Sequence, residues 1–190
     1  HGTELLWFLY FGRLPSFQIL CTYNKLKLME FKISCLLFIR NHAEKILLLK
    51  RKKSPNQGLW SPPGGKLNMN IGESPYECAV REAKEETGMT LNNDDLSLFG
   101  YVSEKGYENS CHWLMFLFEC KKTIVNLPQE FEEGYFDFFT RNEINHLGIP
   151  ASDHKLVWPF YDKQKSGFWG VSADCSNPLL PKIKIEASPE

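Results

Sequence analysis

The chain has 190 residues, a size typical of one domain with its own core, and a formal net charge of −1. The near balance of charge argues against a protein that binds nucleic acid through many phosphates. The sequence contains no run of 18 apolar residues, so we expect no membrane span and a cytoplasmic protein. None of the six cysteines forms a C-x-x-C pair, which excludes zinc-ribbon and thioredoxin-like sites and favours free, buried thiols.

The chain divides into three parts by sequence pattern. Residues 1–28 precede Met29 and a clean strand pattern, so they are either an upstream extension or an added N-terminal strand. Residues 29–176 hold the regular patterns of one domain. Residues 177–190 contain three prolines and are predicted to form a loose C-terminal tail.

The alternation of strand and helix patterns predicts an α/β fold. Apolar and β-branched runs predict strands over 33–40, 45–51, 96–103, 112–120, 135–139 and 168–173. The run over 112–120 is almost continuously apolar, which indicates a central strand buried on both faces. Short helical segments are expected over 141–146 and from Ser152 or Asp153 towards Trp158, where Pro159 bends or ends the second one. A mixed sheet covered by helices follows.

The clearest single element is a helix over 75–87. Ser74 is a suitable N-cap, Pro75 suits the first helical position, and Glu77 completes a capping box with Ser74. Gly88 provides the left-handed stop. Just upstream, two prolines and the glycines Gly64 and Gly65 form a turn where backbone can approach a ligand closely.

Three carboxylates share one face of this helix. Glu82, Glu85 and Glu86 are spaced i, i+3, i+4, and two of them lie in the last turn. Like charges at that spacing repel, and acids near a helix C-terminus oppose its dipole. A bound divalent cation would remove the conflict, and all-oxygen ligands suit Mg²⁺ or Mn²⁺. The alternative is a solvated acidic face paired with Arg81 and Lys84.

The segment that carries these acids resembles the Nudix box. Gly65…Glu73–x7–Arg81–Glu82–Ala83–x–Glu85–Glu86–x–Gly88–Met89 is similar to G-x5-E-x7-R-E-U-x-E-E-x-G-U, in which U is aliphatic. The spacing departs from the pattern at one place, because seven residues rather than five separate Gly65 from Glu73. We expect Asn68 and Met69 to bulge outwards and leave Gly65 in place, since extra loop residues cost little free energy.

The resemblance implies a Nudix-type α/β/α sandwich with a catalytic loop–helix–loop, and roles for the residues of the box. Glu85 and Glu86 are the first choice of Mg²⁺ ligands, and Glu82 is a third ligand or the base that deprotonates water. Glu73 supports the ligands or binds an additional ion. Arg81 orients the acids and is expected to pair with Glu77 and Glu85. The Gly65 carbonyl is a further metal ligand in the resemblance.

Other site residues lie outside the box. Family members use an acid from a later loop as base or ligand, for which the choice is Glu133, with Glu130 and Glu132 beside it; an exposed acidic loop is the alternative. Lys50 and Arg51 could touch phosphates, and aromatic side chains could stack on a base unless they belong to the core. The aromatic residues concerned are Trp60, Tyr107 and Trp113.

The function implied by the resemblance is Mg²⁺-dependent hydrolysis of a pyrophosphate bond in a nucleoside diphosphate linked to another moiety. Oxidised deoxynucleoside triphosphates such as 8-oxo-dGTP, or ADP-ribose, lead the substrates, and dinucleoside polyphosphates stay open because of Tyr107. The alternatives are a catalytically weak nucleotide-binding module and an RNA 5′-end pyrophosphohydrolase. A homodimer is also compatible with the resemblance.

Overall fold

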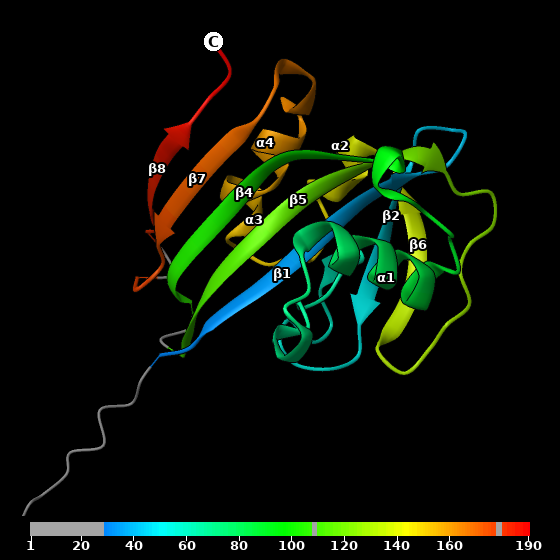
Figure 1. The fold of residues 1–190 in the computed structure, drawn as a ribbon, viewed down its shortest axis with the longest axis horizontal. Coiled ribbons are helices and arrows are strands. Elements are labelled where there is room, and N and C mark those ends of the chain that lie inside the picture. The colour runs from blue at the N-terminus through cyan, green and yellow to red at the C-terminus, as the bar shows by residue number, and fades with distance from the viewer. Residues whose placement is uncertain (1–28, 108–109, 178–179) are drawn as a thin grey trace, which may run out of the picture.

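The computed structural model describes residues 29–107, 110–177 and 180–190 (Figure 1). The segment 1–28, for which an extension or an extra strand was predicted, lies outside the described residues. A single sheet of eight strands runs through the described part, in the order β3-β2-β1-β5-β4-β7-β8, with β6 paired to β2. The strands are β1 (Phe31–Arg40), β2 (Ile46–Arg51), β3 (Trp60–Ser61), β4 (Leu96–Tyr107), β5 (Cys111–Thr123), β6 (Gly134–Phe139), β7 (Trp169–Asp174) and β8 (Lys182–Ala187).

The sheet is mixed, as predicted. The pairs β1–β5 and β4–β7 are parallel, and the other neighbours are antiparallel. The apolar strand β5 lies between β1 and β4, which confirms its central place.

Helices cover both faces of the sheet (Figure 1). The helix α1 (Pro75–Thr87) packs Cys78, Ala79 and Ala83 against one face, in a core with Leu37 and Phe118. On the other face lie three short helices, whose apolar residues form a second core with Phe38 and Leu117 of the sheet. They are α2 (Arg141–Ile144), α3 (Asp153–Leu156) and α4 (Trp158–Tyr161). The chain therefore has the expected three-layer architecture.

The strands β1 and β2 diverge, which opens the sheet beside α1. Their register contains one pair, Arg40 with Ile46. Where β2 moves away, the segment 63–66 takes its place along β1: Pro63 and Gly65 carbonyls accept from the Leu37 and Cys35 amides at 2.8 and 2.9 Å. This insertion brings the two glycines beside the helix that carries the acids.

One prediction at the C-terminal end is wrong. The tail 177–190 is not loose over its whole length, because Lys182–Ala187 forms β8 and pairs antiparallel with β7. This strand lies at the edge of the sheet, and its isoleucines Ile183 and Ile185 are 41% and 52% exposed. The helical segment is interrupted beside Pro159, as predicted: α3 ends at Leu156, and Pro159 occupies the first turn of α4, where its missing amide hydrogen costs nothing.

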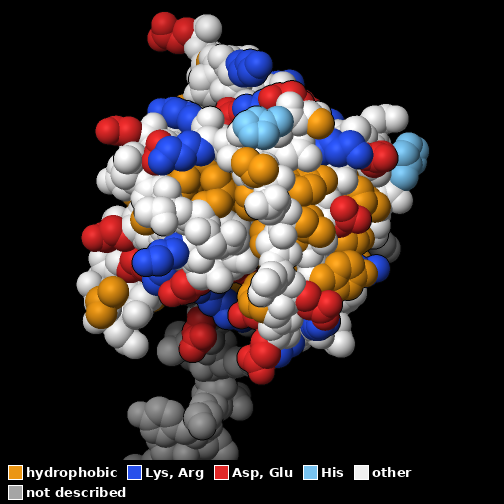
Figure 2. Space-filling view, turned by 90° about the vertical axis from the view of Figure 1, so that its right-hand side faces the viewer, with side chains coloured by type: hydrophobic (Ala, Val, Ile, Leu, Met, Phe, Trp, Pro, Cys, Tyr) orange, Lys and Arg blue, Asp and Glu red, His pale blue; other side chains and the backbone are white. Residues whose placement is uncertain are grey.

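The described surface and thiols agree with the composition. Five cysteines are free and buried, and Cys21 lies outside the described residues. Across residues 29–107, 110–177 and 180–190, no helix is long and apolar enough to cross a membrane. On the face shown in Figure 2, Lys and Arg side chains are interspersed with Asp and Glu, so that face carries no concentrated positive patch.

Candidate active site

A pocket of about 450 Å³ opens beside the inserted glycines, and its floor is the sheet face that also bears α3 and α4. Ser34 and Leu36 of β1 line it, together with Trp113 and Met115 of β5. One end carries Glu82, Glu86 and Glu133 with the two glycines. The pocket thus joins the C-terminal half of α1 to the middle of the sheet.

The local sequence builds α1 as predicted. The Ser74 hydroxyl accepts from the Glu77 amide at 3.3 Å, and the Glu77 carboxylate accepts from the Ser74 amide at 2.8 Å. Gly88 closes the helix with φ 74° and donates to the Lys84 carbonyl. Upstream, the longer loop folds as a 3₁₀ turn over Met69–Ile71. Met69 is 66% exposed, so the two additional residues bulge outwards as expected.

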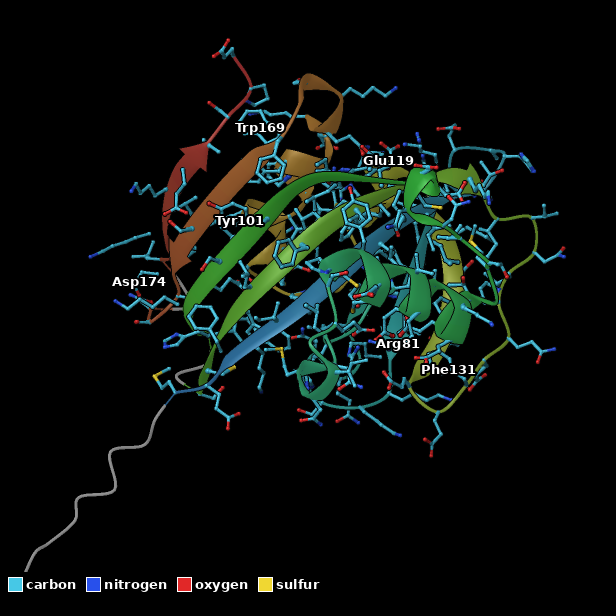
Figure 3. The ribbon with its side chains drawn as sticks, viewed as in Figure 1. Arg81, Tyr101, Glu119, Phe131, Trp169 and Asp174 are labelled. Carbon is cyan, nitrogen blue, oxygen red and sulfur yellow. The ribbon has the colours of Figure 1, made fainter. Side chains whose placement is uncertain are left out.

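Arg81 joins the loop to the helix (Figure 3). Its Nε and one terminal nitrogen donate to both oxygens of Glu73 at 2.7 and 2.9 Å, a two-point pair that fixes the guanidinium plane. The other terminal nitrogen donates to Glu82 at 2.7 Å and Glu85 at 3.0 Å. The expected pair with Glu77 is wrong, because the capping box already holds that carboxylate.

The electrostatic effect of Arg81 is uneven across its partners. Its hydrogen bonds hold the pKa of Glu73 below the ordinary value of that carboxyl. For Glu82, loss of hydration raises the pKa despite the contact with Arg81. Arg81 therefore favours the charged form of Glu73 more effectively than that of Glu82.

Glu86 is the most buried acid of the box, with 8% of the residue exposed. Its Oε2 accepts from the Gly64 amide at 2.8 Å. Burial, with Glu82 and Glu133 nearby, raises the pKa of Glu86 to about 8. The Gly64 amide and Arg51 lower the pKa of Glu86, but burial outweighs them. The pocket end is thus rich in carboxylate oxygen and poor in compensating positive charge.

Glu85 takes a different position. Its side chain is 60% exposed and turns to Arg81. Glu85 does not line the pocket, whereas Glu82 and Glu86 do. Within the part of the chain that the structure describes, no three acids, histidines or cysteines already converge at metal-binding distances. Arg81 holds two of the box acids in this arrangement.

The two glycines differ in what they offer to a ligand. The Gly65 carbonyl accepts from the Cys35 amide at 2.9 Å and from the Cys78 thiol at 3.6 Å, and its expected role as a metal ligand stays a prediction. Among the described residues no group donates to the Gly64 carbonyl. Gly64 therefore has the available oxygen, and it lies beside Glu86.

The donor set fits a divalent cation. Partly buried Glu82 and buried Glu86 both have raised pKa values, and the repulsion between their charged forms costs free energy unless a proton or a cation offsets it. Carboxylate and carbonyl oxygens are the ligands of Mg²⁺ and Mn²⁺. Glu82, Glu86 and the Gly64 carbonyl would hold the ion, and Glu85 could join by leaving Arg81.

The remaining predicted contacts separate into two groups. Glu133 and Arg51 line the pocket, and their side chains lie 4.0 Å apart. Lys50 lies over the ring of Trp60, and Trp60 is buried against Phe139. Neither residue lines the pocket, and their expected roles in substrate binding stay predictions.

Two acids of the later loop lie outside the pocket. Glu132 is 89% exposed and pairs with Lys53 at 3.1 Å, while Glu130 pairs with Lys52. Neither lines the pocket. Their strand-end position turns them to solvent, and only Glu133 faces the helix acids.

The aromatic side chains behave differently from Trp60. Trp113 is half-buried on the pocket floor, with the Lys66 ammonium 6.0 Å from its ring centroid. Tyr107 also lines the pocket, and its hydroxyl donates to Asn56 at 2.9 Å. The Lys32 ammonium lies 5.5 Å from the Trp113 ring centroid, so a base that stacks on this ring would lie beside two lysines.

Sequence reasoning missed two pocket acids, Glu104 and Asp153. Both are buried, with 2% and 7% of the residue exposed. Glu104 shares its strand face with Val102, so a charged residue at an inward position of β4 was the available signal. Asp153 was predicted as a helix cap, but the N-cap Ser152 makes no capping hydrogen bond.

Residues 30–159 match the NUDIX domain, and the chain belongs to the Nudix hydrolase family. It is thus a pyrophosphohydrolase by family. An uncharacterised Nudix hydrolase of Bacillus subtilis, YvcI, is 33% identical over 115 residues, which are 60% of this chain and 70% of that protein. The ADP-ribose pyrophosphatase of Methanocaldococcus jannaschii is 32% identical over 123 residues, 65% of this chain and 69% of its own.

Solved structures agree on the fold. A MutT protein of Bacillus halodurans superposes with a TM-score of 0.64 at 23% identity, over 83% of this chain and 99% of that one. The family typically uses a divalent metal, in keeping with the carboxylate-rich end of the pocket.

The Arg81 network leads to a first prediction. We expect Arg81→Lys to lower kcat/KM for pyrophosphate-bond hydrolysis by about 10–100-fold, since an ammonium cannot bind both oxygens of Glu73 and still hold Glu82. Steady-state kinetics would measure it. Arg141→Lys is the matched control, because Arg141 makes the same two-point pair with Asp162 away from the pocket. Equal activity in both variants would contradict the positioning role.

Burial of Glu86 leads to a second prediction, on stability without metal. The unfolded chain loses the Glu86 proton near pH 4.5, whereas the folded chain keeps it until about pH 8. The free energy of unfolding therefore falls as pH rises through that window. Glu86→Gln removes this loss. In EDTA we expect the variant to match the wild type near pH 5 and to exceed it by about 1–3 kcal/mol near pH 8.5, where a buried charge lacks a partner. Urea unfolding at both pH values would test this, and a constant difference would contradict it.

Proposed function

We propose that this chain hydrolyses a pyrophosphate bond of a nucleoside diphosphate derivative with Mg²⁺ as cofactor. Oxidised deoxynucleoside triphosphates such as 8-oxo-dGTP, and ADP-ribose, are the leading substrates. The observation that carries the proposal is the pair of carboxylates, partly buried Glu82 and buried Glu86, at the end of a nucleotide-sized pocket beside the Gly64 backbone. The similarity to an ADP-ribose pyrophosphatase supports the second substrate.

A bound Mg²⁺ would supply neutralisation of phosphate charge and a water of lowered pKa. Glu86 and the Gly64 carbonyl would hold the ion at the carboxylate-rich end of the pocket. Arg81, fixed by Glu73, keeps Glu82 pointed into the pocket. Arg51 lies at the pocket wall, where its guanidinium can bind a phosphate oxygen in place of its long contact with Glu133.

Two carboxylates are placed to accept the proton of the attacking water. Glu82 has its pKa raised by burial, which brings a carboxylate closer to the basicity that water activation requires. Glu133 faces the same space from the loop before β6. Glu82→Gln and Glu133→Gln separate the two, since the base shows the larger fall in kcat and loses the acid limb of the pH profile.

The test is hydrolysis by the purified full chain over a panel of 8-oxo-dGTP, ADP-ribose, diadenosine polyphosphates and 5′-triphosphate RNA, with and without EDTA. We expect turnover of 8-oxo-dGTP or ADP-ribose that depends on Mg²⁺ and is lost in Glu86→Gln. Nucleotide binding in a calorimeter without turnover of any compound would replace the proposal with a nucleotide-binding module. Turnover of the RNA alone would make the chain an RNA-end pyrophosphohydrolase.

A further inference from the structure

The pocket holds a second pair of acids far from the box. Glu104 lies on β4 and Asp153 begins α3, and both side chains are more than nine-tenths buried while they line the pocket. Over the described ranges, neither forms an ion pair with lysine, arginine or histidine. Buried carboxyls without a counter-ion are costly, and they persist where a ligand or a proton satisfies them.

The protein supplies too few donors for these two groups. The Ser152 hydroxyl bonds to each carboxyl, but it carries one hydrogen and cannot donate to both at once. The Cys175 thiol, a weak donor, lies 3.7 Å from Glu104 Oε1. Burial raises the pKa of both carboxyls, and the neighbouring Glu104 adds to the effect at Asp153, whose pKa reaches about 8. Asp153 therefore holds the proton of the pair near neutral pH. The pair can then accept several hydrogen bonds and donate one.

The position of this pair suits the far end of a nucleotide. The distance across the sheet follows from the cross-strand pairs. Lys66 of the glycine turn is paired with Ser34 of β1, which is paired with Met115 of β5. Met115 is paired with Val102 of β4, which lies two residues from Glu104 on the same face. Three strand spacings therefore separate the glycine turn from β4, about 14 Å across the sheet. That span is comparable to the reach of a nucleotide from its second phosphate to the outer edge of its base.

An aromatic surface lies between the two ends. Trp113 is the direct cross-strand partner of Glu104 and lines the pocket floor beside it. A base that stacks on an indole gains about 1–3 kcal/mol without regard to its identity. Stacking on Trp113 would direct the hydrogen-bonding edge of the base at Glu104 and Asp153.

We propose that Glu104 and Asp153 form a base-recognition site for a guanine-type purine. The adjacent ring N–H and exocyclic amino group of guanine donate to the Glu104 carboxylate, and protonated Asp153 donates to the neighbouring carbonyl oxygen. An oxidised guanine presents the same edge. The inference rests on the proposed function and names its substrate class within the same pocket.

The test compares kcat/KM for dGTP and for dITP, which lacks only the exocyclic amino group. The wild-type chain should favour dGTP by about 10–100-fold, the value of one hydrogen bond to a charged acceptor. Glu104→Gln should bring the two substrates to within about threefold, with the larger loss for dGTP and a smaller loss for dITP, whose base keeps the ring N–H. The same comparison with 8-oxo-dGTP and 8-oxo-dITP should give the same pattern.

The remaining outcomes are distinct. Equal use of dGTP and dITP by the wild type, or a preference that persists in Glu104→Gln, overturns the site, and preferred turnover of dATP or ADP-ribose overturns the guanine assignment. Hydrolysis of no nucleotide by the wild type instead refutes the proposed function. If Glu104→Gln melts far below the wild type, the site is tested by Asp153→Asn and by the ratio of dGTP to dITP turnover in the wild type. The wild-type ratio requires no variant.

Discussion

Glu86→Gln is expected to lower kcat/KM for hydrolysis by about 1,000-fold, at the upper end of what removal of one preorganised electrostatic group costs. The neutral amide can still accept from the Gly64 amide, so the fold keeps its geometry. It cannot neutralise a divalent cation beside Glu82. Steady-state hydrolysis of the best substrate of the panel, with Mg²⁺ varied, measures the effect.

The control for this substitution is Glu44→Gln. Glu44 is an exposed acid in the β1–β2 turn that pairs with Arg40, far from the pocket. We expect it to keep wild-type kinetics. Activity of Glu86→Gln within tenfold of the wild type would show that this carboxylate is not part of the catalytic centre. If the same variant is also more stable than the wild type in EDTA, the Glu86 carboxylate lowers the free energy of unfolding and is retained for function.

Replacing the two adjacent glycines with alanine should give opposite losses. A Cβ at Gly64 would lie 2.2 Å from the Cys35 backbone oxygen at a φ of +141°, so the inserted segment would have to leave β1. We expect Gly64→Ala to destabilise the fold by about 3 kcal/mol or more, as strained backbone and lost ladder bonds combine. Urea unfolding measures it.

A Cβ at Gly65 would meet a side chain instead. It would lie 2.0 Å from Glu82 Oε1, which can move away by rotation. We therefore expect Gly65→Ala to fold with near wild-type stability and to lose about 100-fold in kcat, since small displacements of a catalytic group are costly. Equal destabilisation by both alanines would contradict the separate roles of the two glycines.

The local part of the site was predictable from sequence. The capping box of Ser74 and Glu77, and the stop at Gly88, depend on hydrogen bonds between residues three or four apart, so helix geometry alone determines them. The outward bulge of Met69 followed from the low cost of a longer surface loop. Strand periodicity likewise predicted the mixed sheet and the central place of β5.

Predictions failed where the outcome depended on partners distant in the chain. The tail was predicted to be loose because it contains three prolines, although lysine and isoleucine alternate in β8. This segment forms a strand because it pairs with β7. Arg81 was assigned to Glu77 by helical spacing, but the folded loop presents both oxygens of Glu73 to it. Trp60 looked available to a base until its neighbours in β6 buried it.

The sequence by itself determined the helix, the spacing of its acids and the family to which they belong, because short-range geometry and residue order encode all three. The tertiary structure decided which acids share a pocket. Glu82, Glu86 and Glu133 meet there because β1 and β2 diverge and admit the glycine turn beside α1. Glu104 and Asp153 meet because a strand and a helix far apart in the chain pack on one face of the sheet, a contact that no local pattern specifies.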